Sequence, residues 1–151
     1  MSKSNFGFEK PEDSLGFLLW QTTMTWQKLI RKALDQFDIT HPQFVIMATI
    51  LWFQEQKKVS TQIMIARQSN LDKMTVSTAI RALVNLGYLT RAEHETDTRA
   101  KTVLLTVAGK RLISKMVPLV EGIDASFFGV LPVKEQRQLG ASFISLHEKS
   151  L

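Results

Sequence analysis

The sequence has no cysteine among its 151 residues. This absence excludes disulfide bonds, thiolate metal sites and redox sensing by cysteine. Long apolar runs are also missing, because the longest, residues 44–53, is too short to cross a bilayer. The first residues lack the apolar segment and small-residue cleavage site of a signal peptide. We therefore expect a soluble protein of the cytoplasm.

Motifs that mark catalytic, phosphate or metal sites are missing as well. The chain has no Gly-rich phosphate loop, no His-Glu-x-x-His zinc motif and no Gly-x-Ser-x-Gly elbow. Its three histidines, His41, His94 and His147, fall in separate segments without the spacing of metal ligands. Serines and acids are abundant, but no pattern selects a catalytic triad. The sequence predicts no enzyme, no cofactor and no metal site.

What is present is a concentrated positive charge. The composition, 44% hydrophobic and 22% charged, fits one globular domain. The formal net charge is +5, and residues 57–111 contain ten basic and four acidic side chains, so the rest of the chain is close to neutral. A basic segment between neutral ends suggests an anionic partner, with nucleic acid as the first candidate. A solvated basic face is the commoner explanation of such a pattern.

The first two predicted helices differ in how their apolar residues are arranged. Over residues 12–37, apolar side chains recur at steps of three and four, which predicts an amphipathic helix covered by another helix or another subunit. Thr40 and Pro42 suit the first turn of a second helix, as N-cap and early proline. Residues 44–53 are apolar almost all round, which predicts a central helix buried on every side.

Two shorter helices are predicted next. Ser60 suits the N-cap of a helix over residues 61–68, and Ser69-Asn70 supplies a break of turn-forming residues. The following helix runs from residue 72 to about 86, and Gly87 is typical of its end. Two short helices joined by a tight turn indicate a helix-turn-helix.

A hairpin and two helices complete the predicted chain. The periodicity indicates strands at 88–93 and 101–105 around a polar tip, which is the wing of a winged helix. Thr106 suits the cap of a fifth helix, and Pro118 within that helix should bend it. A last helix begins at Leu131-Pro132. One of its faces carries Leu139, Phe143 and Leu146.

The fourth predicted helix has one face suited to DNA. Its buried side consists of Val76, Ala79, Ile80 and Leu83, and its opposite side of Met74, Ser77, Thr78, Arg81 and Asn85. Short hydroxyl side chains allow a helix to approach the major groove closely, and arginine reads guanine or pairs with phosphate. An ordinary polar helix face is the alternative interpretation.

The hairpin adds cations that suit a minor groove or a row of phosphates. Arg91, Arg99 and Lys101 lie on or beside the wing, and Asp97 is close enough in sequence to orient Arg99. A surface hairpin with ordinary exposed ion pairs is the alternative.

These segments resemble regulators of the MarR family. Asp97-x-Arg99, followed by a strand and by Leu105-Thr106-x-x-Gly109, is similar to the family's wing signature. Residues 71–77 and 83–89 resemble the beginning and end of its recognition helix, and residues 128–146 resemble its terminal dimerisation helix. The resemblance covers nearly the whole chain, and the paired signatures are specific in combination.

The resemblance implies a fold, an assembly and a set of DNA contacts. The expected fold is mainly α with a small β-hairpin wing, as a single domain over 1–151 with dimerisation helices at about 12–37 and 107–149 and a winged helix at about 41–106. In a dimer, Arg99 would enter the minor groove and Asp97 would orient it. Thr78 stands where family members often have arginine, so no operator sequence can be borrowed. The expected DNA-binding residues are Ser60, Thr61, Lys73, Met74, Thr75, Ser77, Thr78, Arg81, Arg91, Asp97, Arg99 and Lys101.

The family also implies a ligand, commonly a phenolic or other aromatic anion. Trp20, Met24, Trp52 and Phe53 are the candidates for lining its pocket, although core packing explains aromatic residues at helical spacing better. The sequence thus predicts a ligand-responsive repressor that binds double-stranded DNA at a pseudo-palindromic operator as a homodimer. The alternative is a protein-interaction module that uses the winged helix as a docking surface.

Overall fold

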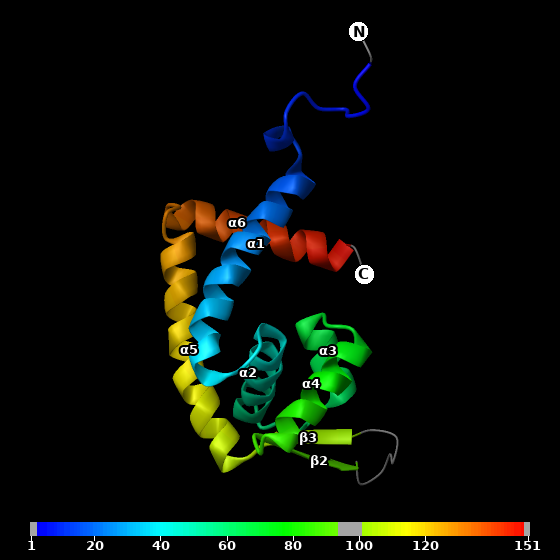
Figure 1. The fold of residues 1–151 in the computed structure, drawn as a ribbon, viewed down its shortest axis with the longest axis vertical. Coiled ribbons are helices and arrows are strands. Elements are labelled where there is room, and N and C mark those ends of the chain that lie inside the picture. Colours follow the sequence, from blue (N-terminus) through cyan, green and yellow to red (C-terminus); the bar gives the residue numbers. More distant parts are fainter. Residues whose placement is uncertain (1–2, 94–100, 150–151) are drawn as a thin grey trace.

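The computed structural model describes residues 3–93 and 101–149, and this part of the chain is mainly helical with one small sheet (Figure 1). The α-helices are α1 (Leu15–Leu34), α2 (His41–Glu55), α3 (Gln62–Ser69), α4 (Lys73–Asn85), α5 (Val107–Phe128) and α6 (Val133–Lys149). The strands are β1 (Ser60–Thr61), β2 (Leu89–Glu93) and β3 (Lys101–Leu105). The predicted winged-helix fold with flanking helices is confirmed. The predicted wing tip, including His94, Asp97 and Arg99, lies outside the described residues.

Most helix ends lie where the capping residues predict them. Thr40 and Gln43 form a reciprocal capping box at the start of α2, with the Thr40 hydroxyl accepting from the Gln43 amide at 3.2 Å and the Gln43 side chain accepting from the Thr40 amide at 3.0 Å. Thr106 caps α5 as predicted. Gly87 follows α4 with φ of +83°, a left-handed conformation that glycine adopts without steric cost.

Two predicted helix boundaries are wrong. Ser60 does not cap α3, because it belongs to β1; Thr61 caps α3 instead, its hydroxyl accepting from the Met64 amide at 3.2 Å. The first helix is shorter than residues 12–37, since Ser14 caps it and 3-10 turns at Pro11–Asp13 and Asp35–Phe37 flank it. In both cases a hydroxyl, that of Ser14 for α1 and that of Thr61 for α3, accepts a free N–H group of the helix.

The sheet has a third, short strand that the hairpin prediction did not include. Its order is β1-β3-β2, and both pairings are antiparallel. Val103 of β3 is the register partner of Ser60 on one side and of Arg91 on the other. The sheet therefore joins the start of α3 to the base of the wing.

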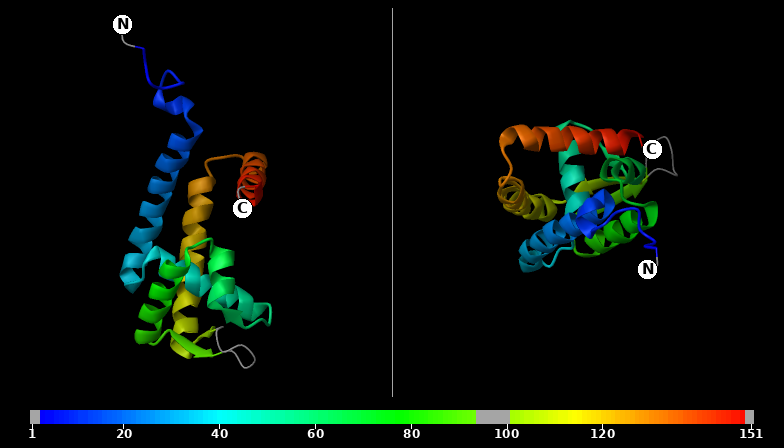
Figure 2. Two further views of the ribbon diagram at one scale, coloured as in Figure 1. Left: turned by 90° about the vertical axis from the view of Figure 1, so that its right-hand side faces the viewer. Right: turned by 90° about the horizontal axis from the view of Figure 1, so that it is seen from above.

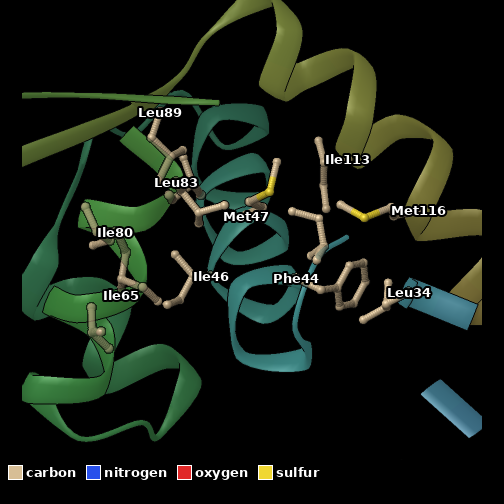
Figure 3. Packing of buried hydrophobic residues seen from close by; sticks show 14 of the residues in the cluster. Leu34, Phe44, Ile46, Met47, Ile65, Ile80, Leu83, Leu89, Ile113 and Met116 are labelled. Atoms are coloured by element: carbon tan, nitrogen blue, oxygen red, sulfur yellow. The ribbon is translucent and has the colours of Figure 1, made fainter. Parts of the chain in front are cut away.

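The hydrophobic core is built around α2 (Figure 3). Ile113 and Met116 of α5 and Leu34 of α1 pack on one side of it, while Ile65, Ile80, Leu83 and Leu89 from α3, α4 and β2 pack on the other. The prediction that α2 is buried on every side is wrong at one position, because Trp52 is 47% exposed. The core thus fixes α4 and the sheet against α2 and leaves their far faces open.

The helices outside the winged helix extend to one end of the molecule. In Figure 2, α1 and α5 run away from the sheet, and the view from above shows α1 and α6 on opposite sides. None of the residues of α6, all of which are described, is buried. No single helix in the described ranges is both long and apolar enough to span a membrane, although α5 and α6 meet those criteria together as a pair bent by 109°.

Candidate nucleic-acid interface

The two faces of α4 are divided as the sequence predicts. Val76, Ile80 and Leu83 are buried against the core together with Ala79, and this packing holds the helix by one side. On the opposite side Met74 is 78% exposed, and Lys73, Thr78 and Arg81 are exposed as well. Ser77 is half-buried at the edge of that exposed face.

The first turn of α4 is fixed by Asp72. One carboxylate oxygen of Asp72 accepts from the Thr75 amide at 2.8 Å, and the other accepts from the Thr75 hydroxyl at 2.6 Å. The hydroxyl and then the amide of Thr75 lower the pKa of Asp72 below its ordinary value of 3.8. The Thr75 hydroxyl is therefore engaged within its own helix turn, while Met74 beside it points to solvent.

A cleft of about 240 Å³ lies between the start of α3, the start of α4 and the sheet. Cations from three elements line it, namely Lys73 of α4, Arg91 of β2 and Lys101 of β3. The guanidinium of Arg91 donates to the side-chain oxygen of Gln62 at 3.4 Å. None of the described lining residues is acidic. The complete described lining is Thr61, Gln62, Ile63, Lys73, Val76, Ser77, Arg91 and Lys101.

This cleft gathers five of the predicted DNA-binding residues. Thr61, Lys73, Ser77, Arg91 and Lys101 line it, and Met74, Thr78 and Arg81 extend the same surface along α4. Gln62 and Ile63 were not predicted; only the pairing of β1 with β3, which the sequence does not reveal, brings the start of α3 to the wing.

Ser60 does not share that surface. Its side chain is fully buried, and its hydroxyl donates to the Val103 carbonyl at 3.4 Å across the sheet. Its position in the ladder between β1 and β3 directs the Ser60 side chain into the interior of the protein, so its role here is structural. The candidates Asp97 and Arg99 lie outside the described residues.

The four candidates for a ligand pocket are not brought together. Trp20 is 62% exposed on α1, whereas Phe53 is buried in α2 and contacts the Trp52 ring, with ring centroids 5.1 Å apart. Trp52 also lines an open hollow of about 420 Å³, and neither Trp20 nor Met24 is among its described lining residues.

A separate polar cluster joins α1, α2 and α5. The Trp26 indole donates to the Asp124 carboxylate at 2.7 Å, and its ring meets His41 edge-on at a centroid distance of 5.2 Å. Burial and then the charge of Arg31 lower the pKa of His41 below 6.5, while Asp124 opposes this shift. Within the described ranges, no three His, Asp or Glu side chains are grouped closely enough to hold a metal ion.

Comparison with known proteins identifies a family and relatives of this chain. The family described as "ArnR1-like, winged-helix domain" matches residues 35–121. The chain is 36% identical over 141 residues to the uncharacterized HTH-type transcriptional regulator YdcH of Bacillus subtilis strain 168, covering 93% of this chain and 96% of the relative.

Two solved structures have the same fold. BpsR of Bordetella bronchiseptica superposes with a TM-score of 0.83 at 22% identity, covering 93% of this chain and 98% of BpsR. That structure concerns the regulation of DNA binding of BpsR by 6-hydroxynicotinic acid. A MarR-family transcriptional regulator from Rhodococcus sp. RHA1 superposes with a TM-score of 0.80 at 20% identity, covering 92% of this chain and 96% of that one.

Proposed function

The chain belongs to the MarR family of winged helix-turn-helix regulators and is a DNA-binding transcriptional regulator, and on that premise we propose that it is a ligand-responsive repressor acting as a homodimer on a pseudo-palindromic operator. One observation carries the proposal. The exposed face of α4 continues into a cleft that three cations from three different elements line. A helix that offers short polar side chains, flanked by cations, is suited to a major groove and its phosphates.

The proposed DNA contacts fall into three groups. Thr78 and Arg81 on α4 would contact base edges, and Lys73, Arg91 and Lys101 would contact phosphates. Arg99 would enter the adjacent minor groove, with Asp97 orienting it. In a dimer the two recognition helices would enter successive major grooves about 10 bp apart.

The proposed dimer uses α1, α5 and α6. Support comes from apolar side chains that α1 and α6 expose, among them Trp20, Val133, Phe143 and Ile144. The proposed location is the cytoplasm, where such a protein meets its operator, and no catalytic role is proposed.

The proposed ligand is a small aromatic or phenolic anion. Support comes from BpsR, a protein of the same fold whose DNA binding is regulated by 6-hydroxynicotinic acid. In one state of the dimer, the spacing of the two recognition helices would not match the operator. A ligand that binds this state better would shift the population toward it and so release the operator.

Selection of genomic fragments by the purified protein at two salt concentrations tests the proposal. We expect an enriched inverted repeat whose affinity falls steeply with salt, because phosphate contacts release counterions. If no DNA is enriched by the folded dimer, the alternative of a protein-docking module takes its place.

Single substitutions assign the contacts. Arg99→Ala should weaken operator binding and leave the dimer and its melting temperature unchanged, whereas Lys28→Ala on the exposed surface of α1 should leave binding unchanged. Normal binding by Arg99→Ala would remove that arginine from the mechanism. Substitution of Thr78 or Arg81 should alter sequence preference, and a uniform loss across all sequences would reassign them to phosphate contacts.

A further inference from the structure

The most exposed apolar side chain of the recognition helix is Met74, at 78% exposure. We propose that Met74 reads thymine by packing against its C5-methyl group in the major groove. This role rests on the operator binding proposed above and names one group on DNA that the protein recognises.

The first turn of α4 directs the Met74 side chain toward solvent. Within the first turn of α4, Val76 is buried and Thr75 is hydrogen-bonded to the Asp72 cap at both its amide and its hydroxyl. The cap holds this turn in helical geometry, so the direction of the Met74 Cα–Cβ bond is set before any partner binds. Its exposure leaves hydrophobic surface in water that a partner can cover.

The surroundings of Met74 match duplex DNA. Residues three, four and seven positions further along a helix share its face, and here these are Ser77, Thr78 and Arg81. Lys73 precedes Met74, and the adjoining cleft adds Arg91 and Lys101. An apolar tip among hydroxyls and cations fits a surface that is strongly anionic but carries isolated apolar groups.

The chemistry of the bases then selects thymine. In the major groove, adenine, guanine and cytosine present hydrogen-bond donors and acceptors, whereas thymine presents a methyl group beside one acceptor. A methionine thioether has no donor and is a weak acceptor, so it gains little from a polar base edge. Its flexible chain adapts well to a methyl group. Met74 therefore favours thymine over cytosine at the base pair that it meets.

Replacing thymine by deoxyuridine tests this role, because deoxyuridine keeps the base pairing and lacks only the methyl group. A random duplex library is first enriched with the wild-type protein. Each thymine of the enriched sequence is then replaced in turn, and affinity is measured for the wild type and for Met74→Ala. We expect one symmetric pair of positions at which deoxyuridine weakens wild-type binding about fourfold per half-site, the usual effect of one buried methyl group.

The variants separate reading from folding. Met74→Ala should melt like the wild type, since the side chain is exposed, and should bind thymine and deoxyuridine duplexes equally. Met74→Leu should keep a preference for thymine. Val107→Ala removes a similarly exposed apolar side chain, 71% exposed at the start of α5, and should keep the full wild-type preference.

Three outcomes would overturn the role of Met74. Wild-type binding that no deoxyuridine replacement weakens would exclude methyl recognition. Equal sensitivity in the wild type and in Met74→Ala would assign the methyl contact to another residue. Failure of the wild type to enrich any duplex would overturn operator binding itself, and with it the role of Met74.

Discussion

Thr106 shows how one hydroxyl connects the wing to the helix that follows it. Its hydroxyl oxygen accepts from the Gly109 amide at 3.0 Å, which caps α5, and its hydroxyl O–H donates to the Gly87 carbonyl at 2.6 Å. Its own amide donates to the Tyr88 carbonyl at 3.0 Å. The cap could be predicted from the sequence, because a threonine preceded a helical pattern. The bond to Gly87 could not, since it depends on how the sheet returns the chain to the end of α4.

Replacing Thr106 tests this connection. Thr106→Val keeps the shape of the side chain but removes both hydrogen bonds, so we expect the free energy of unfolding to fall by about 1–2 kcal/mol. Urea unfolding measures the change. The matched control is Thr25→Val, whose hydroxyl donates only to the Gln21 carbonyl in the same exposed helix turn and should cost less than about 0.5 kcal/mol. Equal losses in the two variants would contradict the connecting role.

His41 makes stability depend on pH at the junction of α1, α2 and α5. Because its pKa is lowered in the folded protein, the unfolded chain binds a proton more readily as the pH falls below about 6.5. Folding stability should therefore fall with acidification through this range and be independent of His41 above it. In urea unfolding between pH 7.5 and 5.5, His41→Gln should lose less stability than the wild type. His147→Gln on exposed α6 is the control, and an unchanged slope in His41→Gln would refute the prediction.

At the scale of elements, the sequence predicts those helices and strands that depend on the residue pattern within one segment. Asp72 and Gly87 mark the ends of α4, and the periodicity between them correctly separates its buried face from its exposed face. The strand β1 has only two residues, too few for any periodicity, and it exists because β3 offers it a partner. The prediction of Ser60 as a cap is wrong for the same reason, since its ladder partner Val103 lies 43 positions away in the sequence.

Helix α5 contacts the base of the wing closely, and a substitution at Gly109 tests this contact. Gly109 is buried, and a Cβ there would overlap the Tyr88 carbonyl oxygen and lie 2.9 Å from its carbon. Both obstacles are backbone atoms of Tyr88, which precedes β2, so α5 would have to move away from this residue. We expect Gly109→Ala to lower the free energy of unfolding by about 1–3 kcal/mol or more.

Gly122 provides the control in the same helix. A Cβ at Gly122 would meet no atom within 4 Å, so Gly122→Ala should raise stability by about 0.5–1 kcal/mol through its higher helix propensity. Thermal or urea unfolding of both variants measures the contrast. A stabilising effect of Gly109→Ala would show that the helix and the wing are not held in this contact.

At the scale of the whole molecule, a single chain leaves apolar side chains of α1 and α6 exposed to solvent. The winged helix shares its core with buried residues of α1 and α5, but α6 has no buried residue along its described length, and α1 exposes Leu15, Leu19 and Trp20. The apolar stripes on these helices could be predicted from the sequence. What covers them could not, because a stripe records that a face is apolar and not which surface meets it. Exposed apolar side chains on both helices at the same end of the molecule favour a second copy of the chain as the cover.

Charge placed on α6 tests that assembly. Phe143 is 45% and Ile144 59% exposed, and an aspartate at either position would have to be buried without a partner if α6 lies in a dimer interface. We expect Phe143→Asp and Ile144→Asp to elute as monomers in size-exclusion chromatography with light scattering, and we expect the wild type to elute as a dimer.

The same substitutions should also separate assembly from DNA recognition. Ser145→Asp adds the same charge on the face of α6 opposite Phe143, so it should remain a dimer. Because the core around α2 is formed within one chain, a monomeric variant should keep weak, salt-dependent binding to a half-site and lose the strong preference for the full inverted repeat, which requires two linked recognition helices. A dimer that persists in both aspartate variants would place the interface elsewhere, and loss of half-site binding by a folded monomer would mean that α4 needs the partner to present its exposed face.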